Sequence, residues 1–385
     1  MEENFTLNTP ASYDQENPEL APAYGLKRKC ALNDLKYFHI SWGSPSDLAH
    51  DLYEGFHIDL LQVTISHILR CKYISSSELN KIISSYPYIG HDLTNKPNQL
   101  IFESATRFRI KSTAAQSLCF VRLLPLMIGN HVPEEDERWI VFCKYLHCLD
   151  FILAPKLTTG DIAYMKSQIE SLLKMFFTLH EDLPVKPKAH HLLHYATQYQ
   201  HFGPLVDYVT LSYESKHQFM KSTIANNTNY KNTCLSMANR HQYNSVYHHL
   251  SSNYFDNDPK FLGHNIETQA SIQPEFSQVL SEVLGPFINV SLCKSVTFNG
   301  QTYDANHCVI TGYNFDYEFA KIAKSLFFNG DIYFVLTKLD NKDYHPHLNA
   351  YILDETETNI VKRYDGLLSL LPIPLYEASN CSDGK

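Results

Sequence analysis

The stretch LVDYVTLSYESKHQFMK, residues 205–221, surrounds the carboxylate of Glu214 with Lys216, His217 and Lys221. This composition suits a site in which a carboxylate holds a cation beside a phosphate. It also suits an ordinary, partly buried ion pair, and structural ion pairs outnumber catalytic ones. On this stretch alone we therefore favour the structural ion pair.

The composition is that of a globular, acidic protein. The chain has 385 residues, of which 44% are hydrophobic, and this is enough for two or three domains. Its net charge of −9 excludes a protein that coats nucleic acid by charge alone. Any contact with nucleic acid must therefore come from a local basic strip.

Three features of the sequence indicate a compartment. The N-terminal stretch MEENFTLNTPASYDQENPEL is polar and acidic, unlike a signal peptide. No apolar run is long enough to cross a bilayer. The nine cysteines are odd in number and contain no CxxC pair, which argues for a reducing compartment. We therefore predict a nuclear or cytoplasmic protein that is not secreted and does not contact a membrane.

Hydrophobic periodicity and turn residues predict an α+β chain in five regions. These are an extended lead-in (1–30), a mixed region (31–252), a linker with a short helix (253–290), a small β-barrel-like module (291–372) and a tail (373–385). Within the mixed region we predict a strand in 31–45, a helix capped by Ser46, and a mostly α-helical block over about 76–200 with a loop over 87–112. In the β module, Asn299-Gly300 and Asn329-Gly330 predict tight hairpins.

Carboxylates that could accompany Glu214 lie at the start of the helix that follows Ser46. Metal-dependent phosphoryl transfer needs carboxylates from distant parts of the chain, because two Mg²⁺ ions clamp the attacking and leaving oxygens. Asp47 or Asp51 can supply the second carboxylate, and His50 can orient one of them. The competing interpretation is plain capping, since carboxylates near a helix N-terminus suit its dipole.

Two other groups of residues carry weaker signals. His190, His191 and His194 have a spacing that allows two imidazoles on one helix face, but no acid lies between them as in zinc proteases, so we favour packing over zinc. The cysteines of the apolar or amphipathic helices are interpreted as core residues and not as nucleophiles: Cys143, Cys148 and Cys234.

With these residues in view, the chain resembles animal transposon-derived proteins related to the CACTA (EnSpm-like) DDE transposases. DLAHDLYEGFHIDL, which begins at Asp47, resembles their D-x-x-H-D-L-x-E-G segment. KPKAHHLLHYATQYQHFGPLVDYVTLSYESKHQFMK, residues 186–221, resembles their histidine-rich block and its final F-E-x-K-H motif. The resemblance covers roughly residues 24–250 well, and the two blocks together are fairly specific.

The resemblance implies an incomplete RNase H-like core, interrupted by a large mostly α-helical insertion. Asp47 with His50 would be the second acidic motif, Glu214 the final acid and Asp51 a rival for Asp47; Mg²⁺ or Mn²⁺ would bind Asp47 and Glu214 if the site is intact. DNA would contact a basic strip made of Lys216, His217, Lys221, Lys231 and Arg240. Self-association or a full-length transposase partner is implied as well.

The chain departs from the family at the first acid of the triad. Only Asp14 and Asp34 precede Asp47, and neither lies in the context of an early strand. We therefore expect the C-terminal part of a transposase, truncated or decayed, with little or no strand cleavage of its own. The alternative is a domesticated, non-enzymatic interaction protein that binds DNA or a peptide. For the peptide we expect an exposed aromatic cage in the β module, built from Tyr303, Tyr313, Tyr333 or Tyr344.

Overall fold

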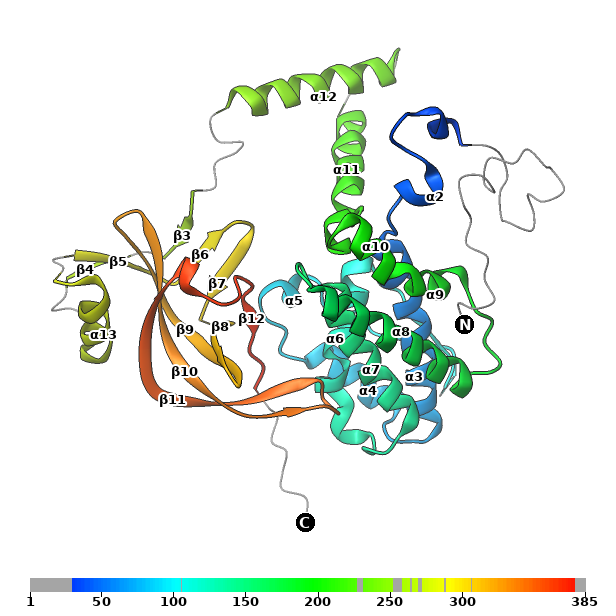
Figure 1. Ribbon diagram of the computed structural model, residues 1–385, viewed down its shortest axis with the longest axis horizontal. Coiled ribbons are helices and arrows are strands. Elements are labelled where there is room, and N and C mark those ends of the chain that lie inside the picture. Colours follow the sequence, from blue (N-terminus) through cyan, green and yellow to red (C-terminus); the bar gives the residue numbers. More distant parts are fainter. Residues whose placement is uncertain are drawn as a thin grey trace. The chain divides into compact units, whose positions relative to one another are not determined.

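The computed structural model describes residues 30–104, 106–226, 231–251, 258–263, 265–268, 272–286, 289–305 and 307–377. The chain divides into two compact units: unit 1 comprises residues 1–85 and 96–218, and unit 2 comprises residues 86–95 and 219–385. Unit 1 is helical and unit 2 carries most of the strands (Figure 1), so the chain belongs to the mixed α and β class. The predicted lead-in lies almost entirely outside the described residues, as does most of the predicted tail.

Unit 1 is a bundle of helices with a single short hairpin among its described residues. Its helices are α2 (Ile40–Gly43), a π-helical segment (Ala49–Phe56), α3 (His57–Arg70), α4 (Ser76–Ser85), α6 (Ala114–Ile128), α7 (Glu137–Ile152), α8 (Thr159–Leu179), α9 (Pro187–His191), α10 (Tyr195–Phe202) and the start of α11 (Leu211–Ala225). The hairpin pairs β1 (Ile101–Phe102) with β2 (Phe108–Arg109). The predicted helical block over 76–200 is confirmed.

Side-chain caps and an apolar interior account for these helices. Thr113 and Gln116 form a capping box at the start of α6, and Thr158 and Asp161 form another at the start of α8. The centre of the bundle is closed by large side chains with almost no exposed surface, including Phe56, Phe120, Trp139, Phe142 and Tyr145. No helix within the described ranges is both long and apolar enough to cross a membrane.

Two local predictions for unit 1 are wrong, and both fail because of hydrogen bonds between side chains and backbone. Residues 31–45 form a 3₁₀ turn and α2 instead of a strand, because Asn33 and His39 accept the backbone N–H groups of Ile40 and Ser41. Ser46 does not cap the next helix; its backbone N–H and its hydroxyl bond to Gln198 instead. The predicted loop over 87–112 contains β1, β2 and the short helix α5 (Gly90–Thr94), which belongs to unit 2.

Unit 2 is built on a seven-stranded sheet and a three-stranded sheet. The large sheet has the order β11-β10-β9-β5-β4, with β8 pairing β9 and β12 pairing β8, and the small sheet has the order β3-β6-β7. The strands are β3 (Lys260–Leu262), β4 (Asn265–Thr268), β5 (Asn289–Cys293), β6 (Ser295–Phe298), β7 (Gln301–Asp304), β8 (His307–Asn314), β9 (Asp316–Phe328), β10 (Asp331–His345), β11 (Ala350–Arg363) and β12 (Ile373–Pro374). The described part of unit 2 also contains α12 (Thr233–Leu250) and α13 (Pro274–Leu284), in addition to α5 and the end of α11.

Turn chemistry places the two predicted hairpins where they were expected. Asn299 and Asn329 both have φ of 50°, and each is followed by a glycine that also has a positive φ, as a tight I′-type turn requires. The predicted linker is wrong in part, because β3 and β4 lie within it and pair with β6 and β5. Among the described residues β4, β11 and β12 each pair with a single strand, so the expected barrel is not closed there.

The large sheet of unit 2 buries side chains in two separate clusters. In one cluster Leu280 of α13 packs with Leu326 and Val335 of the sheet. In the other, Tyr303 and Phe334 pack with residues of β6, β8 and β9. Neighbouring residues at the start of β10 pack into different clusters, so both faces of the strand are apolar there. The sequence of this strand is therefore a nearly continuous apolar run, which is typical of a strand that is buried on both faces.

Candidate functional site

Asp47 connects the starts of two helices in unit 1. Its backbone carbonyl accepts the N–H of Asp51 at 3.0 Å, and its Oδ1 accepts the N–H of Ala49 at 3.1 Å, so it caps its own helix. The same carboxylate accepts the backbone N–H of Thr210 at 3.1 Å and the hydroxyl of Thr210. The carbonyl of Thr210 in turn accepts the N–H of Glu214, which places Thr210 at the start of α11.

Thr210 was not among the predicted site residues, although the sequence contains a signal for it. Threonine is a preferred residue just before the first turn of a helix, and Thr210 stands immediately before the helical stretch that contains Glu214. A search for helix caps around Glu214 would have found it. What such a search cannot show is that the partner of Thr210 is Asp47, which comes from a distant part of the chain.

His50 bridges the two predicted catalytic acids. Its Nδ1 contacts Oδ2 of Asp47, and its Nε2 lies 3.4 Å from Oε1 of Glu214. The imidazole belongs to the π-helical segment, a rare conformation that is frequent at functional sites. The structure therefore brings Asp47, His50 and Glu214 together at an exposed surface, with about half of the His50 and Glu214 side chains open to solvent.

The charges of this group shift two pKa values in opposite directions. The hydrogen bond to Asp47 is the main reason why the pKa of His50 is raised, and the charge of Glu214 adds to it. Burial by itself would raise the pKa of Asp47, but the hydrogen bonds from Thr210 and His50 outweigh it and lower that pKa. Both shifts favour an imidazolium between two carboxylates.

Asp51, the rival of Asp47, faces a different part of unit 1. It is buried, with Oδ1 3.0 Å from Nδ1 of His191, and its Oδ2 accepts the hydroxyl of Tyr195 at 3.4 Å. The hydrogen bond to Asp51 raises the pKa of His191. These partners tie the π-helical segment to α9 and α10, which is a structural role.

The geometry of Asp47 does not fit a magnesium or manganese ligand. A carboxylate offers about four lone-pair directions, and Asp47 receives four donors, from Ala49, His50 and twice from Thr210. Within the described residues no three His, Cys, Asp or Glu side chains form a group that could hold a metal ion.

The predicted DNA-contacting residues all lie at the surface, on α11, on α12 or between them. Lys216, His217 and Lys221 are exposed on α11, Lys231 is exposed before α12, and Arg240 is exposed on α12. Helix α12 buries none of its side chains and exposes 73% of Tyr243 and 68% of Tyr247. On α11, Lys216 follows the exposed Tyr213 by three residues, and on α12, Arg240 precedes the exposed Tyr243 by three residues.

The histidine cluster of α9 and of the 3₁₀ turn that follows it (Leu192–His194) makes two separate sets of contacts. His191 pairs with Asp51, whereas Nε2 of His190 and Nε2 of His194 lie 3.0 Å apart with their rings nearly perpendicular. Two nitrogens at this distance share a proton, so one imidazole donates and the other accepts. This arrangement agrees with the hydrogen-bonding role that we favoured over zinc.

The cysteines are free thiols in the described part of the chain. Cys148 is buried and Cys143 is half-buried, and burial raises the pKa of each thiol to about 12, which disfavours the reactive thiolate. Cys234, which we predicted to be a core residue, is exposed on α12. That prediction is wrong because α12 packs none of its faces deeply.

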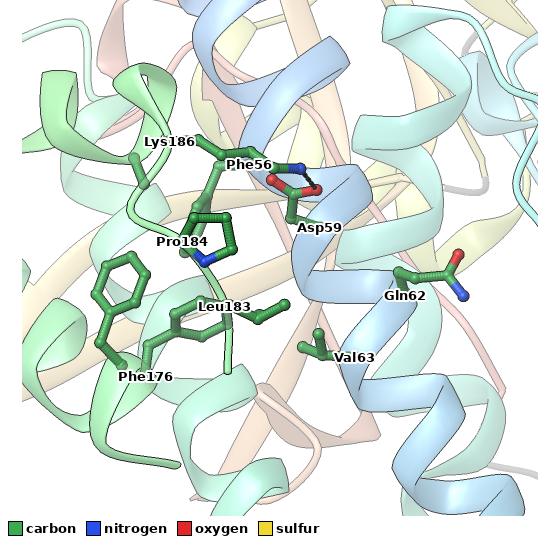
Figure 2. A pocket seen from close by; sticks show the side chains of 10 residues that line it. Phe56, Asp59, Gln62, Val63, Phe176, Leu183, Pro184 and Lys186 are labelled. Carbon is green, nitrogen blue, oxygen red and sulfur yellow. Dashed lines mark hydrogen bonds and ion pairs between the residues drawn. The ribbon is translucent and has the colours of Figure 1, made fainter. Parts of the chain in front are cut away.

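A small apolar pocket lies in unit 1, and its lining contains none of Asp47, His50 and Glu214. Phe56, Phe176, Leu183 and Pro184 line it (Figure 2), and its volume is about 240 Å³. Nζ of Lys186 lies 2.6 Å from Oδ1 of Asp59 beside it, and this ion pair is the charged part of its lining. Ligand pockets usually measure roughly 300–1,000 Å³, so this space suits one apolar group at most. No sequence motif marks it.

Comparison of the chain with protein-family models, with curated proteins and with solved structures gives no significant match in any of the three.

Proposed function

We propose that this chain is a transposase-derived, non-enzymatic protein of the cell interior that binds nucleic acid through α11 and α12. One observation carries the proposal. Residues 215–255 contain three lysines and one arginine and no aspartate or glutamate, in a chain whose net charge is −9. A stretch without acids in an acidic protein is the local basic strip that contact with a polyanion requires.

The exposed tyrosines of α12 support nucleic acid over other polyanions. Tyr243 and Tyr247 stand one turn apart on the helix, and both rings are largely open to solvent. Rings of this kind stack on unpaired bases, with about 1–3 kcal/mol per base, whereas a simple phosphate or sulfate polymer offers nothing to stack. We therefore expect a preference for single-stranded over double-stranded DNA.

The non-enzymatic part of the proposal follows from the hydrogen bonds of Asp47. In the family that the chain resembles, this carboxylate would hold Mg²⁺ or Mn²⁺, but here its oxygens stabilise two helix starts. Unit 1 would then contain the second and third acids of an incomplete RNase H-like core, together with its helical insertion. Among the described residues of unit 1 the strands are β1 and β2, which form one short hairpin and not the sheet of such a core.

The test is binding of fluorescein-labelled single- and double-stranded DNA, followed by anisotropy over a series of salt concentrations. Lys216→Gln with Lys221→Gln should weaken binding and flatten the dependence on salt, by about 0.7–0.9 in the log–log slope for each phosphate that the protein no longer neutralises. Tyr243→Leu with Tyr247→Leu should weaken single-stranded binding more than double-stranded binding.

The matched control is Lys81→Gln, an exposed lysine of α4 far along the chain from the basic strip. It should leave both the affinity and the salt slope unchanged. Equal reductions in log affinity per lost charge for Lys81→Gln and for the α11 variant would show that only overall charge matters. Wild-type protein that binds neither DNA form at low salt would rule the proposal out.

A further inference from the structure

A cluster of aromatic rings lies where the long strands of unit 2 end. Tyr313 of β8 and Tyr317 of β9 have ring centroids 5.3 Å apart, and Tyr317 lies 6.3 Å from Phe319. Tyr351 of β11 lies 5.1 Å from Phe319 and 5.2 Å from Tyr344 of β10. We call these five rings the aromatic cluster. Rings from four strands thus form one continuous set.

The aromatic cluster is open to solvent on most of its members. Tyr313 exposes 63% of its surface, Tyr317 41%, Tyr351 38% and Tyr344 36%, whereas Phe319 is buried beneath them. Phe315, in the turn between β8 and β9, exposes 96%. Isolated exposed rings are ordinary, but a contiguous exposed apolar patch marks an interaction site.

The strand pairing explains why these rings are not covered by the sheet. Strand β10 pairs β9 only as far as Leu339, which faces Phe319, and then continues with β11 alone, from Asp340 to His345. The β10–β11 ribbon therefore extends past the end of β9 (Figure 1). Tyr344 and Tyr351 are cross-strand partners on this ribbon.

The surroundings of the aromatic cluster are strongly acidic. Residues 312–319 and 339–355, which carry its rings, contain six acidic residues and one lysine, Lys342. That lysine pairs with Asp340 and Asp354. Among the described residues no lysine or arginine pairs with Asp316, Glu318 or Asp343. Successive side chains of a strand point to opposite faces. Asp316 and Glu318 are the neighbours of Tyr317 on β9, so they lie on the opposite face of the strand, one residue away from the ring.

We propose that the aromatic cluster is a docking surface for a lysine- or arginine-rich segment of a partner protein. Ring faces attract ammonium and guanidinium groups within about 6 Å. The three carboxylates without a basic partner lie within one or two residues of the rings, and a distance of this order is within the Debye length of about 10 Å at 0.1 M salt. The same negative charge repels nucleic acid. This surface and the basic strip of α11 and α12 would therefore bind different partners.

Of the four tyrosines that we expected to form a cage, two belong to this surface. Tyr303 is fully buried and donates its hydroxyl to the carbonyl of Leu370, and Tyr333 packs against the cluster of Leu326 and Val335. Tyr313 and Tyr344 are exposed, and Tyr317 and Tyr351 join them.

The experiment is fluorescence anisotropy of the full-length chain with three labelled peptides of alternating residues: lysine with serine, trimethyl-lysine with serine, and glutamate with serine. The lysine peptide should bind and the glutamate peptide should not. Trimethylation keeps the charge but removes the hydrogen bonds, so binding through the rings should survive it. Tyr317→Ser with Tyr351→Ser should weaken lysine-peptide binding about tenfold.

Two further variants keep the inference falsifiable if the tyrosine variant does not fold. Asp316→Asn, Glu318→Gln and Asp343→Asn together remove the charge at exposed positions, and they should also weaken binding. Tyr37→Ser, at a tyrosine of unit 1 that exposes 80% of its surface, is the matched control and should have no effect. Equal binding of lysine and glutamate peptides, or an equal reduction in affinity for the control, would overturn the inference. So would sedimentation showing a dimer of the wild type that the Asp316→Asn, Glu318→Gln, Asp343→Asn variant keeps and the Tyr317→Ser, Tyr351→Ser variant loses.

Discussion

The imidazole of His50 lies between two carboxylates, with Nε2 3.4 Å from Glu214 and Nδ1 against Asp47. The two acids come from segments far apart in the chain, and an imidazolium here would supply the positive charge that a metal ion supplies between carboxylates elsewhere. The carboxylate of Asp47 also accepts hydrogen bonds from backbone N–H groups at the starts of two helices. Asp47 therefore has a structural role in this chain, and His50 links it to Glu214.

His50 should titrate above its ordinary range in the folded protein. Its pKa is raised, first by the hydrogen bond to Asp47 and then by the charges of Asp47, Glu214 and Glu54. Nitrogen-detected NMR titration of the histidines should therefore show a pKa for His50 that falls most in Asp47→Asn, less in Glu214→Gln and least in Glu54→Gln. The reverse order would mean that the bridge does not exist in solution.

Asp47 should matter for stability more than Glu214 does. Asp47→Ala removes the cap of its own helix and the anchor of Thr210, and removal of a cap costs about 0.5–2 kcal/mol. Glu214→Gln changes an exposed pair, for which about 0–1 kcal/mol is usual. Urea unfolding of the two variants against wild type measures the difference in free energy of unfolding. An Asp47→Ala protein as stable as wild type would contradict the capping role.

Mg²⁺ and Mn²⁺ should not bind at Asp47. The four donors that already occupy its oxygens leave no direction free for a metal. Calorimetry with either ion should give the same heats for wild type, Asp47→Asn and Glu214→Gln. Binding that is present in wild type and disappears in both variants would show that the carboxylates rearrange around a metal.

His57 should lower the free energy of unfolding as the solution becomes acidic. It is fully buried, and burial lowers its pKa to about 3 from 6.5, so the native state keeps it neutral while the unfolded chain protonates it. Its contribution is complete above pH 6.5 and is lost as the pH falls toward 3, with a slope of up to about 1.4 kcal/mol per pH unit.

The check is urea unfolding of wild type and His57→Asn across this range of pH. Asparagine keeps a donor for the hydroxyl of Ser117, 3.2 Å from Nδ1, but does not titrate. The free energy of unfolding should fall less steeply in the variant below pH 6.5. Parallel curves for the two proteins would mean that His57 is protonated without cost in the folded state.

Local signals in the sequence were sufficient for most helices and for both hairpins. The capping residues Thr113 and Thr158 mark helix starts, and the Asn-Gly turns at Asn299 and Asn329 mark hairpins, because each acts on backbone within a few residues. The prediction of a strand in 31–45 is wrong for a reason that is also local. Asn33 and His39 hydrogen-bond nearby backbone, and no neighbouring strand competes for it among the described residues.

The sequence by itself determined which side chains could meet: Asp47, Asp51, His50 and Glu214 were all candidates on grounds of residue type and spacing. Only the tertiary structure decided among them. It directs Asp51 to His191 and Tyr195, and Asp47 to Thr210, because Asp47 precedes the π-helical segment and caps it, whereas Asp51 lies within the segment and points into unit 1. The aromatic cluster depends in the same way on strand register, which brings Tyr351 to Phe319 and which no local pattern specifies.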